Sequence, residues 1–293
     1  MEGFGANAVR EMLARHGLRI SKSLGQHFLI DGNITEKMVR LSGLDSDCGV
    51  LEIGPGTGAL TLKLCSAAGY VTAVELDKRL LPILDETLCR ADNVGVVQGD
   101  ILKLNLIELV NEYMPGYRHH VCANLPYNIT SPIIAAILDT GVFETITVMV
   151  KREVAQRICA KPGSSEYGSF SIYVNYHTEA ELLFDVSPEC FLPKPKIWSS
   201  VIKLKTRKQH LLKPVHEKAL FSVVRAAFNQ RRKTLVNALH AAYGANMSKE
   251  EIRTIIEHCG FNSMTRGETL SIDSFSMISE RFINQVDVDS NLL

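Results

Sequence analysis

The sequence predicts an α/β protein in which a doubly wound, Rossmann-like sheet precedes a small C-terminal all-helical domain. Three observations support this prediction: short apolar runs alternate with helical patterns as far as Val150, a glycine-rich loop follows the first run, and helical patterns alone continue after Lys205. The composition, 46% hydrophobic and 22% charged, suits a chain that buries a core. We therefore expect two domains, residues 1–205 and 206–293.

The first domain is expected to carry five strands and the helices that join them. The predicted strands are 49–53, 71–75, 95–98, 120–123 and 145–150, and the predicted helices are 58–67, 78–89, 104–113 and 131–139. A helix capped by Asp31 or Asn33 is expected before them. Two later runs, 180–186 and 198–205, are expected to add edge strands. Because strands alternate with helices, most of the sheet should be parallel.

Helices are the only elements expected in the second domain. A basic linker, 206–213, precedes Pro214, which suits the first turn of a helix. Ser248 and Glu251 form a capping box for a further helix, which Gly260 ends. The last helix is marked by apolar residues at helical spacing: Phe275, Ile278 and Phe282.

The charges divide unevenly along the chain, although the net charge is zero. Residues 1–190 hold 16 Lys and Arg against 23 Asp and Glu, whereas residues 191–293 hold 16 against 9. Within 191–240 there are 12 basic residues and 1 acidic residue. A concentrated positive stretch is typical of a surface that binds a polyanion, and a solvated helix face is the alternative.

The cysteines and the apolar runs argue against several classes of protein. Seven widely spaced cysteines without a Cys-x-x-Cys pair argue against a zinc site and a disulfide framework and favour a reducing cytoplasm, so we predict no metal. No apolar run is long enough to cross a bilayer. The first 20 residues mix acidic and basic side chains and lack an apolar signal region. We therefore expect no membrane partner.

Glycines and acids at three predicted strand ends indicate a cofactor site. Gly54, Gly56 and Gly58 follow the first strand, where glycine lets the backbone turn sharply and approach a ligand. Glu75 ends the second strand and can accept hydrogen bonds from both hydroxyls of a ribose. Asp100 ends the third strand and can accept one from an adenine amine. The G-x-G-x-G spacing differs from the G-x-G-x-x-G of dinucleotide folds and favours S-adenosyl-L-methionine, which has no phosphate.

The segment Asn124-Leu125-Pro126-Tyr127 follows the fourth strand and predicts chemistry on an adenine amine. The lone pair of that amine is delocalised into the ring, so the amine is a poor nucleophile. The Asn124 side-chain oxygen and the Leu125 carbonyl can accept its two hydrogens and favour a pyramidal nitrogen. Pro126 stiffens the turn, and Tyr127 can stack on the base. The sequence therefore predicts an adenine N6 methyltransferase, although the motif alone is also compatible with an ordinary turn.

Six segments carry a family resemblance: 22–29, the loop at Gly54, 124–129, 191–196, 228–235 and 266–271. Along nearly its whole length the chain resembles the small-subunit (16S) ribosomal RNA adenine N6,N6-dimethyltransferases, the kasugamycin-sensitivity family. The resemblance implies that S-adenosyl-L-methionine methylates two adjacent adenosines in a hairpin loop near the 3′ end of the RNA. It also implies the small ribosomal subunit as partner, a role in subunit biogenesis, a monomer and a cytoplasmic location.

The same resemblance implies roles for individual residues. The expected cofactor-binding residues are His27, Leu29, Gly54, Gly56, Glu75, Asp100, Ile101 and Asn124. Phe191 would face the extruded adenine opposite Tyr127. The residues expected to hold RNA phosphates are Lys194, Lys196, Arg225, Arg231, Arg232 and Lys233. His27 and Trp198 depart from the family pattern, which more often has Asn and a small residue at these positions, and the pattern assigns no role to Trp198.

Four alternatives stay open. A large-subunit rRNA adenine methyltransferase of the macrolide-resistance type shares the cofactor and catalytic motifs, but segment 266–271 favours the small-subunit enzyme. A ribosome-assembly checkpoint factor with secondary catalysis would keep its function when Glu75 or Asn124 is replaced. A DNA adenine methyltransferase would need a target-recognition module that a short helical tail hardly supplies. A nicotinamide dehydrogenase would bind NAD and give no thermal shift with adenosylmethionine.

Overall fold

The computed structural model describes residues 4–20, 25–208 and 214–283. The chain divides into two compact units, the first made of Met1–Ala155 and Glu179–Thr206, the second of Gln156–Thr178 and Arg207–Leu293. The main division therefore falls within one residue of the boundary expected at 205 and 206. The second unit also takes in 156–178, a segment that the sequence analysis assigned to the first domain.

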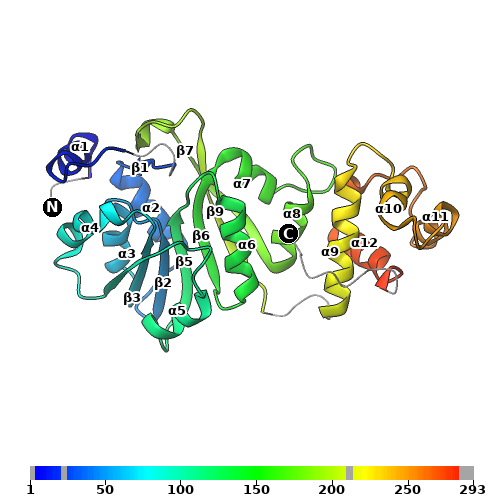
Figure 1. Cartoon of the computed structure of the whole chain (residues 1–293), viewed down its shortest axis with the longest axis horizontal. Helices are drawn as coiled ribbons and strands as arrows, with labels where there is room; N and C mark the ends of the chain where they lie inside the picture. Colours follow the sequence, from blue (N-terminus) through cyan, green and yellow to red (C-terminus); the bar gives the residue numbers. More distant parts are fainter. Residues whose placement is uncertain (1–3, 21–24, 209–213, 284–293) are drawn as a thin grey trace. The chain divides into compact units, whose positions relative to one another are not determined.

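The first unit is a seven-stranded sheet with helices on both faces (Figure 1). Its elements are α1 (Ala6–Arg15), β1 (Phe28–Leu29), α2 (Gly32–Ser42), β2 (Cys48–Ile53), α3 (Ala59–Cys65), β3 (Tyr70–Glu75), η1 (Lys78–Leu80), α4 (Leu81–Leu88), β4 (Val94–Gln98), α5 (Leu106–Tyr113), β5 (Arg118–Asn124), α6 (Thr130–Thr140), β6 (Thr145–Lys151), β7 (Thr178–Val186), η2 (Pro188–Cys190), β8 (Phe191–Leu192) and β9 (Ser199–Thr206). Helix α7 (Arg152–Ile158) leads from this unit into the second.

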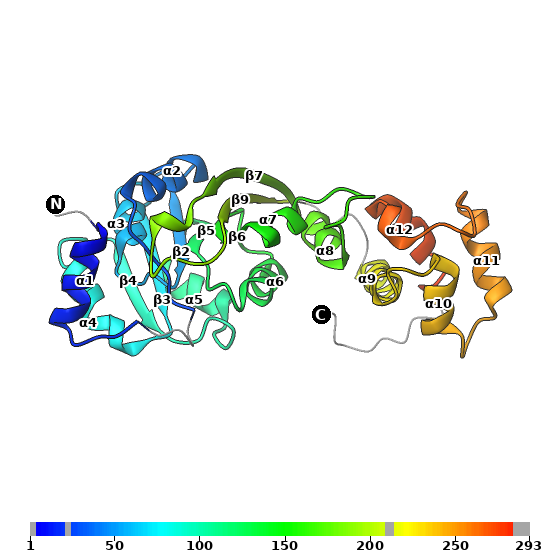
Figure 2. The same cartoon turned by 90° about the horizontal axis from the view of Figure 1, so that it is seen from above.

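The strand order is β4-β3-β2-β5-β6-β9-β7. Neighbouring strands from β4 to β6 are parallel, whereas β9 runs antiparallel to β6. The connections through α3 and α4 lead from β2 toward one edge, and those through α5 and α6 lead toward the other edge. Right-handed crossovers therefore place the two pairs of helices on opposite faces of the sheet. Figure 2 shows α2 and α3 on one face and α5 and α6 on the other. The strand order reverses between β2 and β5, where a doubly wound sheet binds its ligand.

The five predicted strands and the helices between them are confirmed within about two residues at each end, the usual scatter of element boundaries. The cap of α2 is also confirmed, because the Asp31 side chain accepts a hydrogen bond from the backbone N–H of Asn33. The prediction that both late runs form edge strands is wrong for β9, which lies between β6 and β7. Its first four residues and Leu204 are buried, whereas β7 alternates between buried and exposed residues as an edge strand does.

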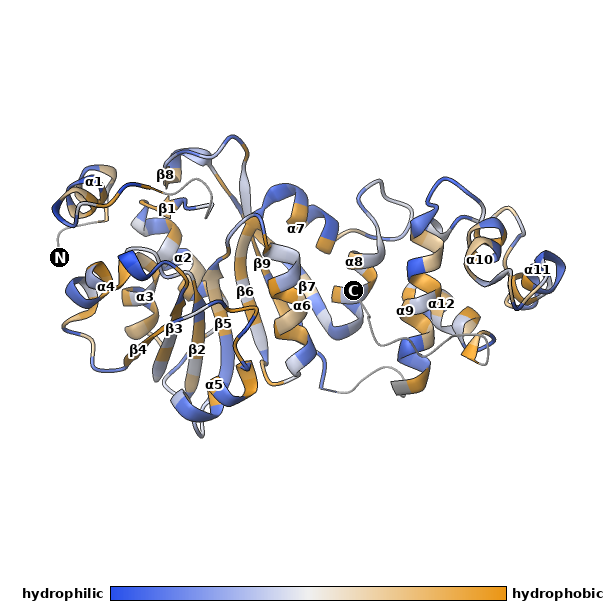
Figure 3. Ribbon diagram, viewed as in Figure 1, coloured by the Kyte–Doolittle hydropathy of each residue, from blue (hydrophilic) through white to orange (hydrophobic). Residues whose placement is uncertain are grey.

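The core of the first unit lies on both faces of its sheet. All six residues of β2 are buried, and so are six of the seven in β6. Strands buried on both faces read as continuous apolar runs, which explains why these two were recognisable in the sequence. Hydrophobic colouring accordingly follows the central strands, while the connecting loops are mainly hydrophilic (Figure 3).

The second unit is helical. Its elements are α8 (Ser169–His177), α9 (Pro214–Asn229), α10 (Leu235–Tyr243), α11 (Lys249–His258), η3 (Gly267–Thr269) and α12 (Ile272–Ser279). The capping box of α11 is confirmed, since Ser248 and Glu251 exchange side-chain and backbone hydrogen bonds. Helix α8 was not predicted, because five of its nine residues are buried and no polar face gives it a helical period. Rings of α8 and α9 pack together, with Tyr176 and Phe221 centred 5.2 Å apart.

Candidate cofactor and adenine site

A cavity of about 150 Å³ lies where the carboxyl ends of β2, β3, β4 and β5 meet. All residues predicted to bind the cofactor line it: His27, Leu29, Gly54, Gly56, Glu75, Asp100, Ile101 and Asn124. Leu125, Pro126 and Tyr127 of the predicted catalytic motif line it as well. The fold therefore brings the two predicted motifs to one site at the point where the strand order reverses.

The glycine loop after β2 forms one wall of this cavity. Gly54 and Gly56 have φ values of 69° and 61°, in the left-handed region that favours glycine. The Gly56 N–H points to the Glu75 carboxylate, with a distance of 3.4 Å to Oε2. A Cβ atom on Gly56 would lie 3.0 Å from the ring of Phe28, which also lines the cavity. The loop thus keeps open a cradle that any side chain would begin to fill.

Two of the predicted acids differ in how much of their side chain remains available. Glu75 is buried, its Oε1 accepts a hydrogen bond from the Asp77 N–H at 2.8 Å, and burial raises its pKa. Asp100 is partly exposed and caps a turn, because its Oδ1 accepts from the Leu102 N–H at 3.1 Å. Its Oδ2 lies 3.8 Å from Lys103 Nζ. Asp100 therefore caps a turn and also lines the cavity.

Glu52 is a third acid in the cavity wall to which the sequence analysis assigned no role. It lies within β2, is 1% exposed, and its Oε2 has no hydrogen-bond partner among the described residues. Burial, the main cause, raises its pKa to about 8, and the nearby Glu75 adds to the effect. An acid inside an otherwise apolar strand is the sequence feature that points to this residue.

The cavity wall is acidic in character. Glu52, Glu75 and Asp100 all contribute to it, and no Lys or Arg belongs to its lining as far as the chain is described. Opposite charges stabilise each other strongly where water is excluded. The wall therefore favours a ligand that carries positive charge, as the sulfonium and amine of adenosylmethionine do.

Asn124, the last residue of β5, offers an acceptor that no described residue uses. Its Nδ2 donates to the carbonyl oxygen of His27 at 3.2 Å, which fixes the orientation of the amide. Its Oδ1 is buried and lacks a hydrogen-bond partner within the described part of the chain. A buried acceptor without a partner costs free energy, so it marks a place where a ligand donor fits. The adjoining Leu125 N–H donates to the Met149 carbonyl, and Leu125 is also among the residues that line the cavity.

Tyr127 is held as a fixed aromatic surface. Its ring is stacked with that of His27, with centroids 5.5 Å apart and an interplanar angle of 23°. Its hydroxyl lies 2.5 Å from Oγ of Ser199, the buried first residue of β9. Burial raises the pKa of Tyr127 to about 12, so the phenol stays neutral and is unsuited to accept a proton. The arrangement suits a stacking residue, and Ser199 is a supporting residue that the sequence analysis missed.

Two short strands connect the N-terminal segment to the loop before β9. Phe28 pairs with Leu192 and Leu29 with Phe191, in antiparallel register. Phe191, which was predicted to face the target base, is 3% exposed and packs in a core cluster with Leu29. It is not among the residues that line the cavity. His27 Nδ1 lies 2.7 Å from the Pro193 carbonyl and so adds a polar contact to this pairing.

The residues predicted to bind RNA lie outside the cavity. In the first unit, Lys194 pairs with Glu189, and Lys196 is exposed without an ion pair to any described carboxylate. In the second unit, the exposed residues without such a pair are Arg225, Arg232 and Lys233. These four cations are therefore available for a polyanion.

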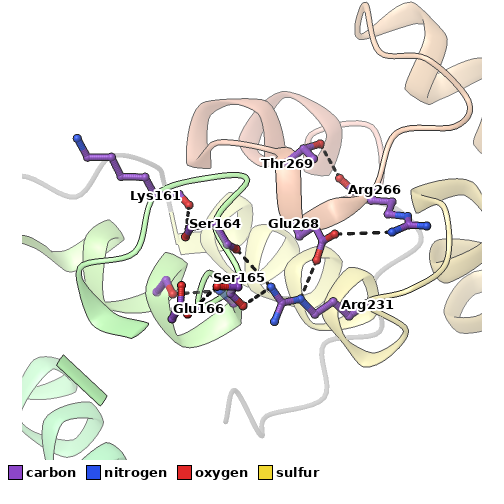
Figure 4. A network of polar contacts seen from close by, with 10 residues as sticks. Lys161, Ser164, Ser165, Glu166, Arg231, Arg266, Glu268 and Thr269 are labelled. Carbon is purple, nitrogen blue, oxygen red and sulfur yellow. Dashed lines mark hydrogen bonds and ion pairs between the residues drawn. The ribbon is translucent and has the colours of Figure 1, made fainter. Parts of the chain in front are cut away.

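Arg231 differs from these residues because its side chain is engaged within the second unit (Figure 4). Its Nε donates to Glu268 at 2.8 Å, and its Nη2 donates to the Ser165 carbonyl at 2.6 Å. The backbone carbonyl of Glu268 also accepts a hydrogen bond from the Gly163 N–H, at 2.8 Å. Arg231 thus joins the 156–178 segment to η3, and this structural role competes with the predicted phosphate contact.

Other kinds of site find little support in the described ranges. Within 4–20, 25–208 and 214–283, no group of His, Cys, Asp and Glu is arranged to hold a metal ion. None of the helices in those ranges combines the length and the apolar character needed to span a bilayer. None of the seven cysteines, all of which lie in the described ranges, is part of a disulfide.

Known proteins resemble this chain in both sequence and fold. A family model described as ribosomal RNA adenine dimethylase matches residues 17–284. A protein of Shouchella clausii named ribosomal RNA small subunit methyltransferase A is 43% identical over 271 residues, 92% of this chain and 92% of that protein. A protein of the same name from Geobacillus thermodenitrificans is 43% identical over 273 residues, 92% of this chain and 93% of that protein.

Two solved structures share the fold over most of the chain. A dimethyladenosine transferase from Plasmodium falciparum has a TM-score of 0.74 and 25% identity, covering 88% of this chain and 98% of that one. The 23S rRNA methyltransferase ErmE has a TM-score of 0.67 and 25% identity, covering 87% and 98%.

Proposed function

The chain belongs to the ribosomal RNA adenine dimethylase family, and from this premise we propose that its substrate is a pair of adjacent adenosines in small-subunit (16S) rRNA. The protein is an enzyme that methylates rRNA adenine with S-adenosyl-L-methionine. The finer proposal is that each adenosine lies in a hairpin loop near the 3′ end and receives two methyl groups. The adenine chemistry is carried by the buried Asn124 oxygen, which has no hydrogen-bond partner among the described residues and lies beside Leu125 in the wall of the cavity, whereas the hairpin loop and the two methyl groups rest on the family resemblance.

The residues around the cavity fit adenosylmethionine, which supplies an electrophilic methyl group on a sulfonium when it is bound. Gly54 and Gly56 leave room for the ligand beside the loop. Glu75 would accept hydrogen bonds from the ribose hydroxyls, and Asp100 would accept one from the adenine amine of the cofactor. His27, Leu29 and Ile101 also line the cavity and would complete the site. Orienting a bound methyl donor toward the target amine would be the main contribution of these residues to the rate.

Asn124 and Leu125 prepare the target amine. The Asn124 Oδ1 and the Leu125 carbonyl each accept one N6 hydrogen, so the nitrogen becomes pyramidal and its lone pair leaves conjugation with the ring. Pro126 keeps the Leu125 carbonyl in place by stiffening the turn. Tyr127 stacks on the base, and its hydrogen bond to Ser199 keeps the ring in position. No strong base would be required before transfer: the nitrogen lone pair would bond to the methyl carbon as the carbon–sulfur bond breaks to give a neutral thioether, and the resulting cationic, acidic amine would then lose its proton to water.

Phe191 supports this site from behind. Since it is buried and paired with Leu29, we assign it to holding the N-terminal segment against the cavity. A direct contact between Phe191 and the target base is the other proposal, which the family resemblance implies. Methylation kinetics of Phe191→Leu separate them, because loss of a stacking partner raises the KM for RNA and loss of packing weakens cofactor binding as well.

The small ribosomal subunit is the proposed partner. The relatives at 43% identity carry a small-subunit name, whereas the large-subunit enzyme ErmE is 25% identical. The exposed cations Lys196, Arg225, Arg232 and Lys233 would hold RNA phosphates and fix the position of the substrate. We further propose that the enzyme acts as a monomer in the cytoplasm during subunit biogenesis, a compartment in which cysteines outside disulfides are usual.

Transfer of a labelled methyl group from adenosylmethionine to 30S particles that lack the modification tests the proposal. We expect N6,N6-dimethyladenosine at two adjacent positions of the small-subunit RNA. Asn124→Ala should lower kcat by about a hundredfold or more, the usual effect of removing one preorganised polar contact. Asn246→Ala, which removes an exposed Asn of the second unit, is the matched control and should leave kcat unchanged.

Three results would contradict the proposal. Methylation of large-subunit RNA in place of 30S RNA would show that the enzyme is of the macrolide-resistance type. If no adenine is methylated, the proposed activity itself is wrong. If cells with Glu75→Ala or Asn124→Ala mature their subunits normally while loss of the protein blocks maturation, binding is the essential role and catalysis is secondary.

A further inference from the structure

Trp198 is an exposed aromatic residue that neither the core nor the cofactor site uses. It is the only tryptophan of the chain and is 47% exposed. It precedes β9 and does not line the cavity. Isolated exposed apolar residues are common on protein surfaces. Its surroundings distinguish Trp198 from an ordinary surface side chain.

The backbone at Trp198 is fixed close to the base-stacking residue Tyr127. The next residue, Ser199, forms the 2.5 Å hydrogen bond with the Tyr127 hydroxyl and is paired with Lys151 in the sheet. The Trp198 carbonyl accepts a hydrogen bond from the Arg152 N–H at 3.0 Å. Because consecutive Cα atoms are about 3.8 Å apart, Trp198 lies one residue from the support of the catalytic ring. The backbone that carries the indole is held by these hydrogen bonds, so on binding mainly the side-chain rotamers of Trp198 have to be ordered.

Two cations lie close to Trp198 along the backbone: Lys196 two residues before it in the sequence, and Arg152, whose backbone N–H donates to the Trp198 carbonyl. Lys196 is exposed without an ion pair to any carboxylate in the described ranges. Arg152 is half-exposed, with Nη2 at 3.3 Å from Asp185. An aromatic face with cations beside it is the combination that single-stranded nucleic acid binds, because the base stacks and the phosphates are neutralised. Ile197, 39% exposed, extends the apolar surface.

We propose that Trp198 stacks on the base next to the target adenosine, so that Tyr127 and Trp198 hold two neighbouring nucleotides of the same RNA strand. The proposal rests on the proposed function, since it requires an RNA substrate with an unpaired neighbour of the target. In a substrate with two adjacent, unpaired adenosines, each adenosine in turn would stack on Tyr127 while the other stacks on Trp198. Stacking tolerates any base, so this contact contributes affinity and register but little sequence selectivity.

Fluorescence of the single tryptophan tests the contact directly in the full-length protein. The probe is an RNA hairpin with two adjacent adenosines in its loop, added together with S-adenosylhomocysteine. Stacking should quench Trp198 emission with the same midpoint as RNA binding followed by anisotropy of a labelled hairpin. Binding without quenching would overturn the proposal. Equal quenching by heparin, which has charge and no bases, would overturn it too.

Kinetics of substituted enzymes supply the second test. Trp198→Ala should raise the KM for 30S particles by about 5- to 150-fold, the range of one lost base stack, with kcat and the cofactor Kd unchanged. Trp198→Phe should retain most of the affinity because it keeps an aromatic face. The control Ile107→Ala removes another exposed apolar side chain of the first unit and should change nothing.

The outcomes separate this proposal from the proposed function. If the wild-type enzyme dimethylates 30S adenosines but Trp198→Ala has an unchanged KM, the stacking contact is refuted and the activity stands. If the wild-type enzyme transfers no methyl group to adenine, the proposed function fails, and the fluorescence titration still decides whether Trp198 stacks on RNA. An unchanged cofactor Kd shows that Trp198→Ala is folded.

Discussion

Glu52 should make the first unit less stable as the pH rises, and Glu52→Gln should remove this dependence. Burial raises the pKa of Glu52 from 4.5 to about 8 in the folded chain. Between these values the unfolded chain has lost the proton and the folded chain keeps it, so stability falls with rising pH. One pKa unit corresponds to about 1.4 kcal/mol, so the loss is roughly 3 kcal/mol by pH 7 and roughly 5 kcal/mol when the titration is complete.

Urea unfolding followed by Trp198 fluorescence measures this effect, because the only tryptophan lies in the first unit. At about pH 5 the wild type and Glu52→Gln should differ little, and at about pH 8 the variant should be more stable by several kcal/mol. Glu112→Gln, an exposed residue of α5, is the matched control and should give a constant difference across the pH range. Parallel pH profiles for the wild type and Glu52→Gln would refute the reasoning, since Glu52 would then titrate alike in both states.

Substitutions at four further residues test the site and the second unit. Gly56→Ala forces a side chain into a left-handed backbone and should weaken adenosylmethionine binding about tenfold by calorimetry; an unchanged Kd would show that the loop adapts. Tyr127→Phe leaves the buried Ser199 hydroxyl unpaired and should lower the free energy of unfolding by about 1–3 kcal/mol while keeping more activity than Tyr127→Ala. Arg232→Gln should reduce the slope of log affinity for RNA against log salt by about 0.7–0.9, whereas Arg231→Gln should leave that slope unchanged and lower stability; equal salt slopes for both variants would contradict this division.

The cofactor site was predictable from the sequence because its residues sit at strand ends. Gly54, Glu75, Asp100 and Asn124 each follow or end one of four parallel strands, and parallel strands end at the same edge of a sheet. Once the strands are recognised from their apolar runs, the convergence of these four positions needs no knowledge of side-chain packing. The sheet order alone decides that they meet.

The remaining features depend on contacts between distant parts of the chain. Phe191 becomes buried because its strand pairs with β1, and no sequence pattern near Phe191 predicts that pairing. Arg231 is similar to its basic neighbours in sequence, but only the fold brings Glu268 and Ser165 to its guanidinium. Helix α8 lacks a polar face, so its period is absent from the sequence. Local patterns therefore locate the chemistry, and tertiary packing decides which neighbouring side chains take part.

Glu52 also links cofactor choice to pH. The pyrophosphate of a dinucleotide would bring negative charge to a cavity wall that contains Glu75 and Asp100 and gains a further negative charge when Glu52 ionises near pH 8, and like charges repel strongly where water is excluded. The positive charges of adenosylmethionine instead stabilise ionised Glu52 and lower its pKa. The affinity for adenosylmethionine should therefore rise between about pH 6 and pH 8, by about tenfold for each unit by which the ligand lowers that pKa. Calorimetry should find this rise in the wild type and a flat profile in Glu52→Gln; NAD binding tighter than adenosylmethionine binding, or a rise that persists in Glu52→Gln, would show that the acid does not select the cofactor.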